Sequence, residues 1–156
     1  MLFLSLLSGR NPHYLIGEQV ISAPIVKDIG LEAISTGYIL LDGGNVTSVE
    51  FMSGTRPIPM DKRDIVAAHA LAGQYLGMKS IYLEAGSGAK NPIPSDIVEL
   101  VSNFVSIPII VGGGISSPEI AARIVKAGAS IIVTGTAIEK NSSCMSEFAS
   151  AVHWKG

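Results

Sequence analysis

Cysteine, aromatic residues and charge are all scarce in this sequence. Cys144 is the single cysteine among 156 residues, so no disulfide can form within the chain, and a reducing compartment is expected. The formal net charge is −2 and no basic tract occurs, which excludes nucleic-acid binding driven by bulk charge. No uninterrupted apolar run is long enough to span a bilayer, and residues 1–7 lack the positive flank of a signal peptide. We therefore expect a soluble, cytoplasmic protein with no nucleic-acid partner.

Apolar residues, in contrast, make up 47% of the chain and gather in five short runs. The runs cover residues 2–7, 37–41, 80–83, 107–111 and 130–134. None of them alternates cleanly with polar residues, which is typical of parallel strands covered on both faces. Helical patterns separate the runs, so we predict an α/β protein that repeats strand and helix.

Three of the connecting segments carry specific expectations. Residues 13–29 predict a helix broken at Pro24, because proline removes a backbone donor from the helix. Residues 46–52 alternate weakly between apolar and polar and are interpreted as a short edge strand. Residues 62–76 predict a single helix. Its sheet-facing residues would be Ile65, Ala68, Ala72 and Leu76.

Five strand–helix units without a linker indicate one domain over residues 1–156. The regular later units fit the second half of a (β/α)8 barrel of the TIM type, and a complete barrel needs about 200 residues or more. On this interpretation the chain is the C-terminal part of the barrel, and the N-terminal strands are missing from it. The competing architecture is a small, open, doubly wound sheet, which needs no further strands.

Glycine-containing turns follow three successive strands, at residues 86–88, 112–114 and 135–136. In both architectures the carboxyl ends of the strands are where ligands bind. The 112–114 turn leads into a helix capped by Ser117, and it presents backbone N–H groups that suit a phosphate or another small anion. Each turn alone could be an ordinary tight connection. Three glycine turns converging on one rim favour a binding site, to which Ser87 and Thr136 can add hydroxyl groups.

Tyr82 and Glu84 alternate along the third strand, so both side chains point to the same side of the sheet. The carboxylate can accept hydrogen bonds from substrate hydroxyls, and the phenol can donate one to a phosphate. The alternatives are core packing for Tyr82 and a solvated loop position for Glu84. Asp42 is interpreted as a turn former rather than a polar contact. No histidine has the spacing of a metal ligand, so no metal-binding residue is assigned.

The three strand ends together resemble a known family. The blocks at residues 82–89 (YLEAGSGA), 110–115 (IVGGGI) and 133–136 (VTGT) are similar to those of the geranylgeranylglyceryl phosphate synthase family, and the resemblance covers essentially the whole chain. The first block is the specific one, because the glycine turns alone are shared with many phosphate-binding barrels.

The resemblance implies a prenyltransferase that makes the first ether bond of archaeal membrane lipids, from sn-glycerol-1-phosphate and geranylgeranyl diphosphate with Mg²⁺. It implies a homo-oligomer whose product enters the membrane. It gives Glu84 a catalytic role, orienting the attacking hydroxyl and helping to take its proton. The substrate-binding residues that it implies are Tyr82, Leu83, Glu84, Ala85, Gly86, Ser87, Gly88, Gly112, Gly113, Gly114, Gly135 and Thr136.

The same resemblance places the Mg²⁺ ligands on the first two strands of the barrel, which this chain does not contain. We therefore expect glycerol phosphate binding here and the metal site elsewhere. Two alternatives stay open: another phosphate-binding TIM-barrel enzyme acting on sugar phosphates, and a non-catalytic partial barrel that needs a partner chain.

Overall fold

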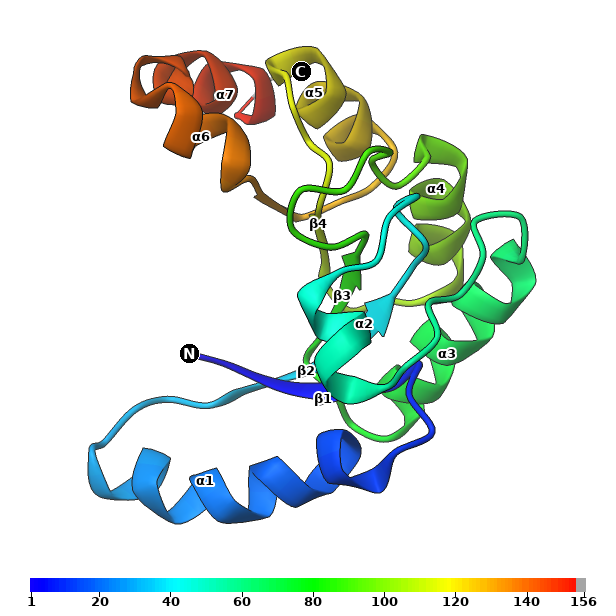
Figure 1. Ribbon diagram of the computed structural model, residues 1–156, viewed down its shortest axis with the longest axis vertical. Helices are drawn as coiled ribbons and strands as arrows, with labels where there is room; N and C mark the ends of the chain where they lie inside the picture. The colour runs from blue at the N-terminus through cyan, green and yellow to red at the C-terminus, as the bar shows by residue number, and fades with distance from the viewer. Residues whose placement is uncertain (154–156) are drawn as a thin grey trace.

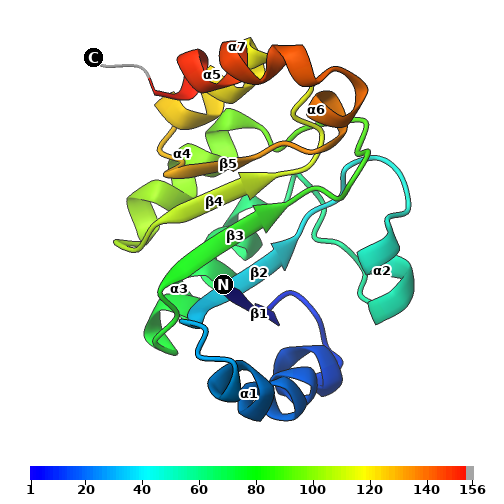
Figure 2. The same cartoon turned by 90° about the vertical axis from the view of Figure 1, so that its left-hand side faces the viewer.

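Five parallel strands form one sheet in which spatial order follows sequence order, β1-β2-β3-β4-β5 (Figure 2). The computed structural model describes residues 1–153. The strands are β1 (Leu2–Leu6), β2 (Ile34–Leu40), β3 (Ser80–Glu84), β4 (Ile109–Gly112) and β5 (Ile131–Val133). A doubly wound sheet reverses its strand order at a switch point, and this sheet does not. Sequential parallel order is that of a TIM-type barrel, as predicted.

Helices connect and flank the strands (Figure 1). A π-helical turn, η1 (His13–Gly17), leads into α1 (Glu18–Asp28). The later helical segments are α2 (Ser48–Ser53), α3 (Arg63–Tyr75), α4 (Ser95–Phe104), α5 (Pro118–Lys126), α6 (Thr136–Lys140), the 3-10 turn η2 (Ser142–Cys144) and α7 (Met145–Val152). Within residues 1–153, none of these helices combines the length and the apolar character needed to cross a bilayer.

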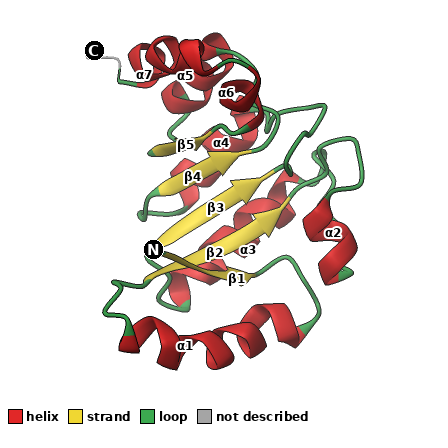
Figure 3. Cartoon of the chain, turned by 60° about the vertical axis from the view of Figure 1, so that its left-hand side comes forward, coloured by secondary structure: helices red, strands yellow, loops and turns green. Residues whose placement is uncertain are grey.

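One face of the sheet is covered by helices and forms the core (Figure 3). Alternate strand residues point to this face, and they include Ile39, Ile81, Leu83 and Val111, all fully or almost fully buried. They pack against α3, α4 and α5. Because burying one such side chain contributes about 1.5–3 kcal/mol, this layer supplies most of the apolar stabilisation.

The opposite face, which is the inner face of a barrel, is uncovered within the described residues (Figures 1 and 2). Five of its apolar side chains are 36–49% exposed. They are Leu2, Leu4, Ile34, Ile131 and Val133. Their register across the sheet also places Tyr82 and Glu84 on this face, at its carboxyl end. The inner face therefore carries the candidate site as well as exposed apolar surface.

Three expectations for the connecting segments are wrong. Pro24 lies within the continuous helix α1. Proline has no N–H to donate to the carbonyl of Val20, four residues earlier, and Val20 is 65% exposed, so water can bind that carbonyl instead. Residues 46–52 do not form an edge strand: Thr47 caps helix α2 by accepting a hydrogen bond from Glu50 N at 3.2 Å.

The buried face of α3 is the third error. Ile65 and Leu76 are exposed, and the helix instead turns its small residues to the sheet. The buried residues are Val66, Ala67, Ala70 and Gly73. A Cβ at Gly73 would lie 2.8 Å from Leu7 Cδ1 and 2.9 Å from Ile81 Cδ1, so close approach to the sheet selects the small residues.

Candidate functional site

The candidate site is centred on two side chains of β3, Tyr82 and Glu84. Glu84 is only 7% exposed, and Tyr82 lies beside it on the same face of the strand. Tyr38, in register with Tyr82 on β2, contacts the Tyr82 ring edge-to-face with a centroid separation of 5.2 Å. The aromatic pair fixes the phenol and thereby the carboxylate next to it.

Glu84 is a buried carboxylate with two hydrogen-bond donors. Gly86 N–H donates to Glu84 Oε1 at 2.7 Å, and the Tyr82 hydroxyl donates to the same carboxylate. Burial raises the pKa of Glu84, and the two hydrogen bonds partly oppose that shift. Burial, followed by the charge of Glu84, raises the pKa of both Tyr38 and Tyr82. Both phenols therefore remain protonated donors at neutral pH, beside a carboxylate that binds a proton more readily than an exposed one.

The 112–114 turn fits closely around Glu84. A Cβ at Gly112 would lie 2.5 Å from Glu84 Oε2 and 2.6 Å from the Tyr82 hydroxyl. Gly113 has a φ of +83° and Gly114 a φ of +69°, a region that favours glycine. All three positions thus require glycine for packing and turn geometry, as expected if the segment is an ordinary tight connection. The same absence of side chains leaves the backbone of the turn open to a ligand.

A second glycine turn faces the first across the site. Gly135 has a φ of −109°, and a Cβ placed there would meet nothing closer than Glu139 Oε1 at 3.8 Å. Packing therefore does not require glycine at this position. The Thr134 hydroxyl donates to Ile115 O at 3.1 Å and ties the end of β5 to the first turn. The two turns are held together by this bond as one rim.

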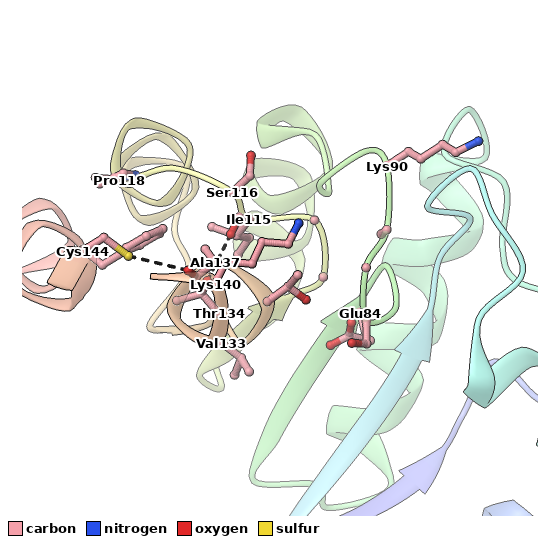
Figure 4. A pocket seen from close by; sticks show the side chains of 18 of the residues that line it. Glu84, Lys90, Ile115, Ser116, Pro118, Val133, Thr134, Ala137, Lys140 and Cys144 are labelled. Atoms are coloured by element: carbon pink, nitrogen blue, oxygen red, sulfur yellow. Dashed lines mark hydrogen bonds between the residues drawn. The ribbon is translucent and has the colours of Figure 1, made fainter. Parts of the chain in front are cut away.

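A pocket of about 850 Å³ opens between these turns (Figure 4). Eight of the twelve substrate-binding residues that the resemblance implied line it. They are Tyr82, Glu84, Ser87, Gly88, Gly113, Gly114, Gly135 and Thr136. The other four, Leu83, Ala85, Gly86 and Gly112, lie immediately behind this lining. Leu83 is fully buried against the helix layer, so its side chain faces away from the pocket.

The structure also brings in residues that sequence reasoning had not assigned to the site. Tyr38, Lys140 and Cys144 line the pocket. The signal for Tyr38 was its register with Tyr82 on the neighbouring strand, which becomes visible only once the strands are paired. Asp42 is exposed and accepts a hydrogen bond from Gly44 N at 2.9 Å, which confirms its role as a turn former.

A second, more apolar pocket of about 610 Å³ adjoins the first. Leu4, Leu6, Tyr14 and Met52 line it, and their side chains come from β1, η1 and α2. Tyr38, Tyr82 and Glu84 line both pockets. The carboxylate therefore stands where a polar compartment meets an apolar one.

The described residues 1–153 contain no group of three or more His, Cys, Asp or Glu side chains arranged to hold a metal ion. Within that part of the chain, the polar groups that line the pocket include hydroxyls, backbone amides, the Asn141 amide, two lysines and separate carboxylates. Such groups suit an anion and a hydroxylated ligand.

Comparisons of the sequence and of the structure with known proteins point to the same family. Residues 1–152 match the family described as the PcrB family. The chain is 56% identical over 153 residues to geranylgeranylglyceryl phosphate synthase of Chitinophaga pinensis, covering 98% of this chain and 61% of that protein. It is 50% identical over 141 residues to the synthase of Pyrococcus horikoshii, covering 90% of this chain and 55% of that protein.

Two solved structures have the same fold over 97% of this chain. The synthase from Thermoplasma volcanium has a TM-score of 0.88 at 35% identity, with 61% of that chain covered. The synthase from Thermoplasma acidophilum, in complex with its substrate sn-glycerol-1-phosphate, has a TM-score of 0.85 at 34% identity, with 59% of that chain covered. The present chain thus spans about 61% of the length of the first curated relatives.

Proposed function

Because this chain belongs to the PcrB family, we propose that it carries the acceptor half of a prenyltransferase site, in which sn-glycerol-1-phosphate is joined to geranylgeranyl diphosphate through an ether bond. One observation carries the proposal: the pocket between the two glycine turns, with Glu84 beside it, occurs in a fold shared over 97% of the chain with a relative crystallised with sn-glycerol-1-phosphate. The same likeness favours this function over one on sugar phosphates.

In this proposal the phosphate of the acceptor lies between the 112–114 and 135–136 turns. Glycine at these positions lets backbone N–H groups approach the anion closely. Ser87 and Thr136 add hydroxyl donors at the same rim. The glycerol hydroxyls then extend toward β3, where Tyr82 and Glu84 offer a phenol and a carboxylate.

Glu84 orients the attacking hydroxyl by accepting its hydrogen bond. The oxygen of that hydroxyl forms a bond to the first carbon of the prenyl chain, while the bond from that carbon to the diphosphate breaks and diphosphate leaves. The hydroxyl proton passes to the Glu84 carboxylate. Burial supports this step, since it raises the pKa of Glu84 and so increases its affinity for the proton.

The prenyl chain of the donor would lie in the apolar pocket along β1, η1 and α2. Its reactive carbon would then be at Tyr38, Tyr82 and Glu84, which together with Val49 line both pockets. This arrangement brings the two substrates together at the carboxylate and leaves the apolar tail away from the phosphate rim.

Magnesium remains an expectation carried by the family resemblance. The described residues 1–153 do not fit a site for it, because no three acidic or imidazole side chains lie together there. No step above depends on a metal ligand of this chain.

We also propose that the protein forms a homo-oligomer, for which the exposed apolar residues of α1 are the motivation.

The decisive test is a transfer assay with the full-length protein, Mg²⁺, labelled sn-glycerol-1-phosphate and prenyl diphosphates of several chain lengths. We expect a labelled prenyl ether that partitions into organic solvent. The enantiomer sn-glycerol-3-phosphate serves as a matched control for the acceptor site. Absence of product at every chain length would refute the proposal, and tighter binding of a sugar phosphate than of sn-glycerol-1-phosphate would favour the alternative enzyme class.

A further inference from the structure

The acceptor pocket contains a positive charge that the glycine turns do not explain. Among the described residues that line it, Lys90 and Lys140 are the cationic ones. In Figure 4 the Lys140 side chain extends into the pocket, whereas the Lys90 side chain points away from it. Lys140 therefore differs from an ordinary surface lysine in its direction.

The short helix α6 accounts for that direction. Thr136 is its first residue and Lys140 its last, four positions later, so both lie on the same face of the helix. Helical side chains lean toward the N-terminus, which carries the Lys140 stem past Thr136 toward the 135–136 turn. The ammonium group is thus directed at the rim where the backbone of two glycine turns is exposed.

Lys140 has no ion-pair partner among residues 1–153. The acidic side chains that share its pocket are Glu84 and Glu147. Glu84 is engaged with Gly86 N–H and the Tyr82 hydroxyl, on the β3 side of the pocket. An unpaired lysine directed into a pocket is a site for an anionic ligand, because the ligand supplies the missing counter-charge.

We propose that Lys140 binds the phosphate group of the acceptor and selects a phosphorylated substrate over the unphosphorylated alcohol. This inference rests on the proposed function, since it assigns a residue to the same acceptor site. The backbone amides of the turns recognise the shape of the phosphate, and Lys140 supplies the charge that distinguishes a dianion from a neutral glycerol.

Calorimetry on the full chain tests this with inorganic phosphate and with sn-glycerol-1-phosphate, at two salt concentrations. Lys140→Gln should weaken the binding of both ligands about tenfold or more, because a bond to a charged group is lost. Lys140→Arg should retain most of the affinity. The affinity of the wild type should fall more steeply with salt than that of Lys140→Gln. Lys79→Gln, at an exposed lysine just before β3, is the charge-matched control and should bind as the wild type does.

Kinetics then separate binding from chemistry. Lys140→Gln should raise KM for sn-glycerol-1-phosphate while leaving kcat nearly unchanged, since the phosphate contact is the same in ground state and transition state. Equal affinity of wild type and Lys140→Gln would overturn the inference while leaving the proposed function intact. A wild type that binds sn-glycerol-1-phosphate no more tightly than glycerol would overturn both. Binding without prenyl transfer would leave Lys140 assigned and count against the proposed function alone.

Discussion

Glu84 shows at the scale of one residue how the site opposes the stability of the fold. A carboxylate that is 7% exposed loses hydration when the chain folds, and two hydrogen bonds return only part of that loss. The raised pKa is the measurable sign of the remaining cost. A residue of this kind is retained where it performs chemistry.

Replacing Glu84 by glutamine should therefore separate activity from stability. Glu84→Gln keeps the shape and an acceptor for Gly86 N–H but removes the proton-accepting charge. Prenyl transfer should fall by about 100-fold or more. The melting temperature should stay the same or rise, because the amide is cheaper to bury. Scanning calorimetry and the transfer assay measure the two effects, and full activity in this variant would show that Glu84 is not the base.

The pH dependence of stability follows from the same shift. In the unfolded chain Glu84 ionises in the ordinary glutamate range, and in the folded chain it holds its proton to higher pH. The folded state thus binds more protons over that window, so the free energy of unfolding should fall as pH rises from the ordinary value through the raised one. Chemical denaturation at a series of pH values should show this fall in the wild type and a smaller one in Glu84→Gln.

Replacing two glycines of the rim by alanine should separate an effect on stability from an effect on ligand binding. Gly113→Ala forces a side chain into a left-handed conformation and toward Glu84 Oε1 at 2.6 Å, so unfolding should become easier by about 2 kcal/mol or more. Gly135→Ala meets only an ordinary contact with Glu139 Oε1 at 3.8 Å and no positive φ, so stability should change by less than about 0.5 kcal/mol. Its added methyl should nevertheless weaken phosphate binding several-fold. Unchanged affinity in Gly135→Ala would mean that this turn does not touch the ligand.

Helix α5 illustrates how one element holds the rim in place. Ser117 N-caps the helix, and its hydroxyl accepts a hydrogen bond from Ile120 N, with Pro118 in the first turn. The cap fixes where the 112–114 turn ends and the helix begins. Ala121 and Ile124 then bury the helix against the core. The position of the glycine turn is thus determined at both ends, by β4 and by this capped helix.

Ser117→Ala should lower the free energy of unfolding by about 1 kcal/mol, because the N–H groups of the first turn lose an acceptor. Denaturant titration measures the loss. Ser150→Ala on the exposed face of α7 removes a hydroxyl without removing a cap, and it serves as the control. An equal loss in both variants would show that the cap contributes nothing specific.

Elements whose pattern is local could be predicted from the sequence, and those decided by tertiary contacts could not. The apolar runs identified all five strands, and Ser117 with Pro118 located the start of α5. The buried face of α3 was misassigned because periodicity favoured the larger residues, whereas the distance to the sheet admits Ala70 and Gly73. Whether Pro24 breaks the helix depends on whether the Val20 carbonyl can reach water, and the local sequence pattern does not reveal that exposure.

The same division applies to the candidate site. Alternation along β3 was enough to place Tyr82 and Glu84 on one face, and the glycine turns identified the rim. Tyr38 required strand pairing, and the direction of Lys140 required the helical turn that α6 forms after β5. The first depends on a contact between two strands far apart in the sequence, and the second on a short helix that the sequence pattern did not predict.

At the scale of the whole molecule, the sheet is covered on one face only. The inner face exposes apolar side chains from β1, β2 and β5, and β1 and β5 are the two edges of the sheet within the described residues. Helix α1 adds Val20, Ile21 and Ile25, each at least 60% exposed. Exposed apolar side chains of this kind favour association, and unpaired strand edges favour it further.

We therefore expect this chain, studied alone, to self-associate and to bind the dye 1-anilinonaphthalene-8-sulfonate. Sedimentation should show a mean mass that rises with protein concentration. The double variant Ile34→Lys/Ile131→Lys places charges on the inner face and should reduce both effects, because a charged side chain opposes the burial of that apolar surface. The lysine at Ile131 also lies on the edge strand β5, where it disfavours pairing with another strand. Leu76→Lys, at the exposed end of α3 on the other side of the sheet, is the control and should behave as the wild type. A chain that remains monomeric at every concentration and binds no dye would show that the inner face does not drive association.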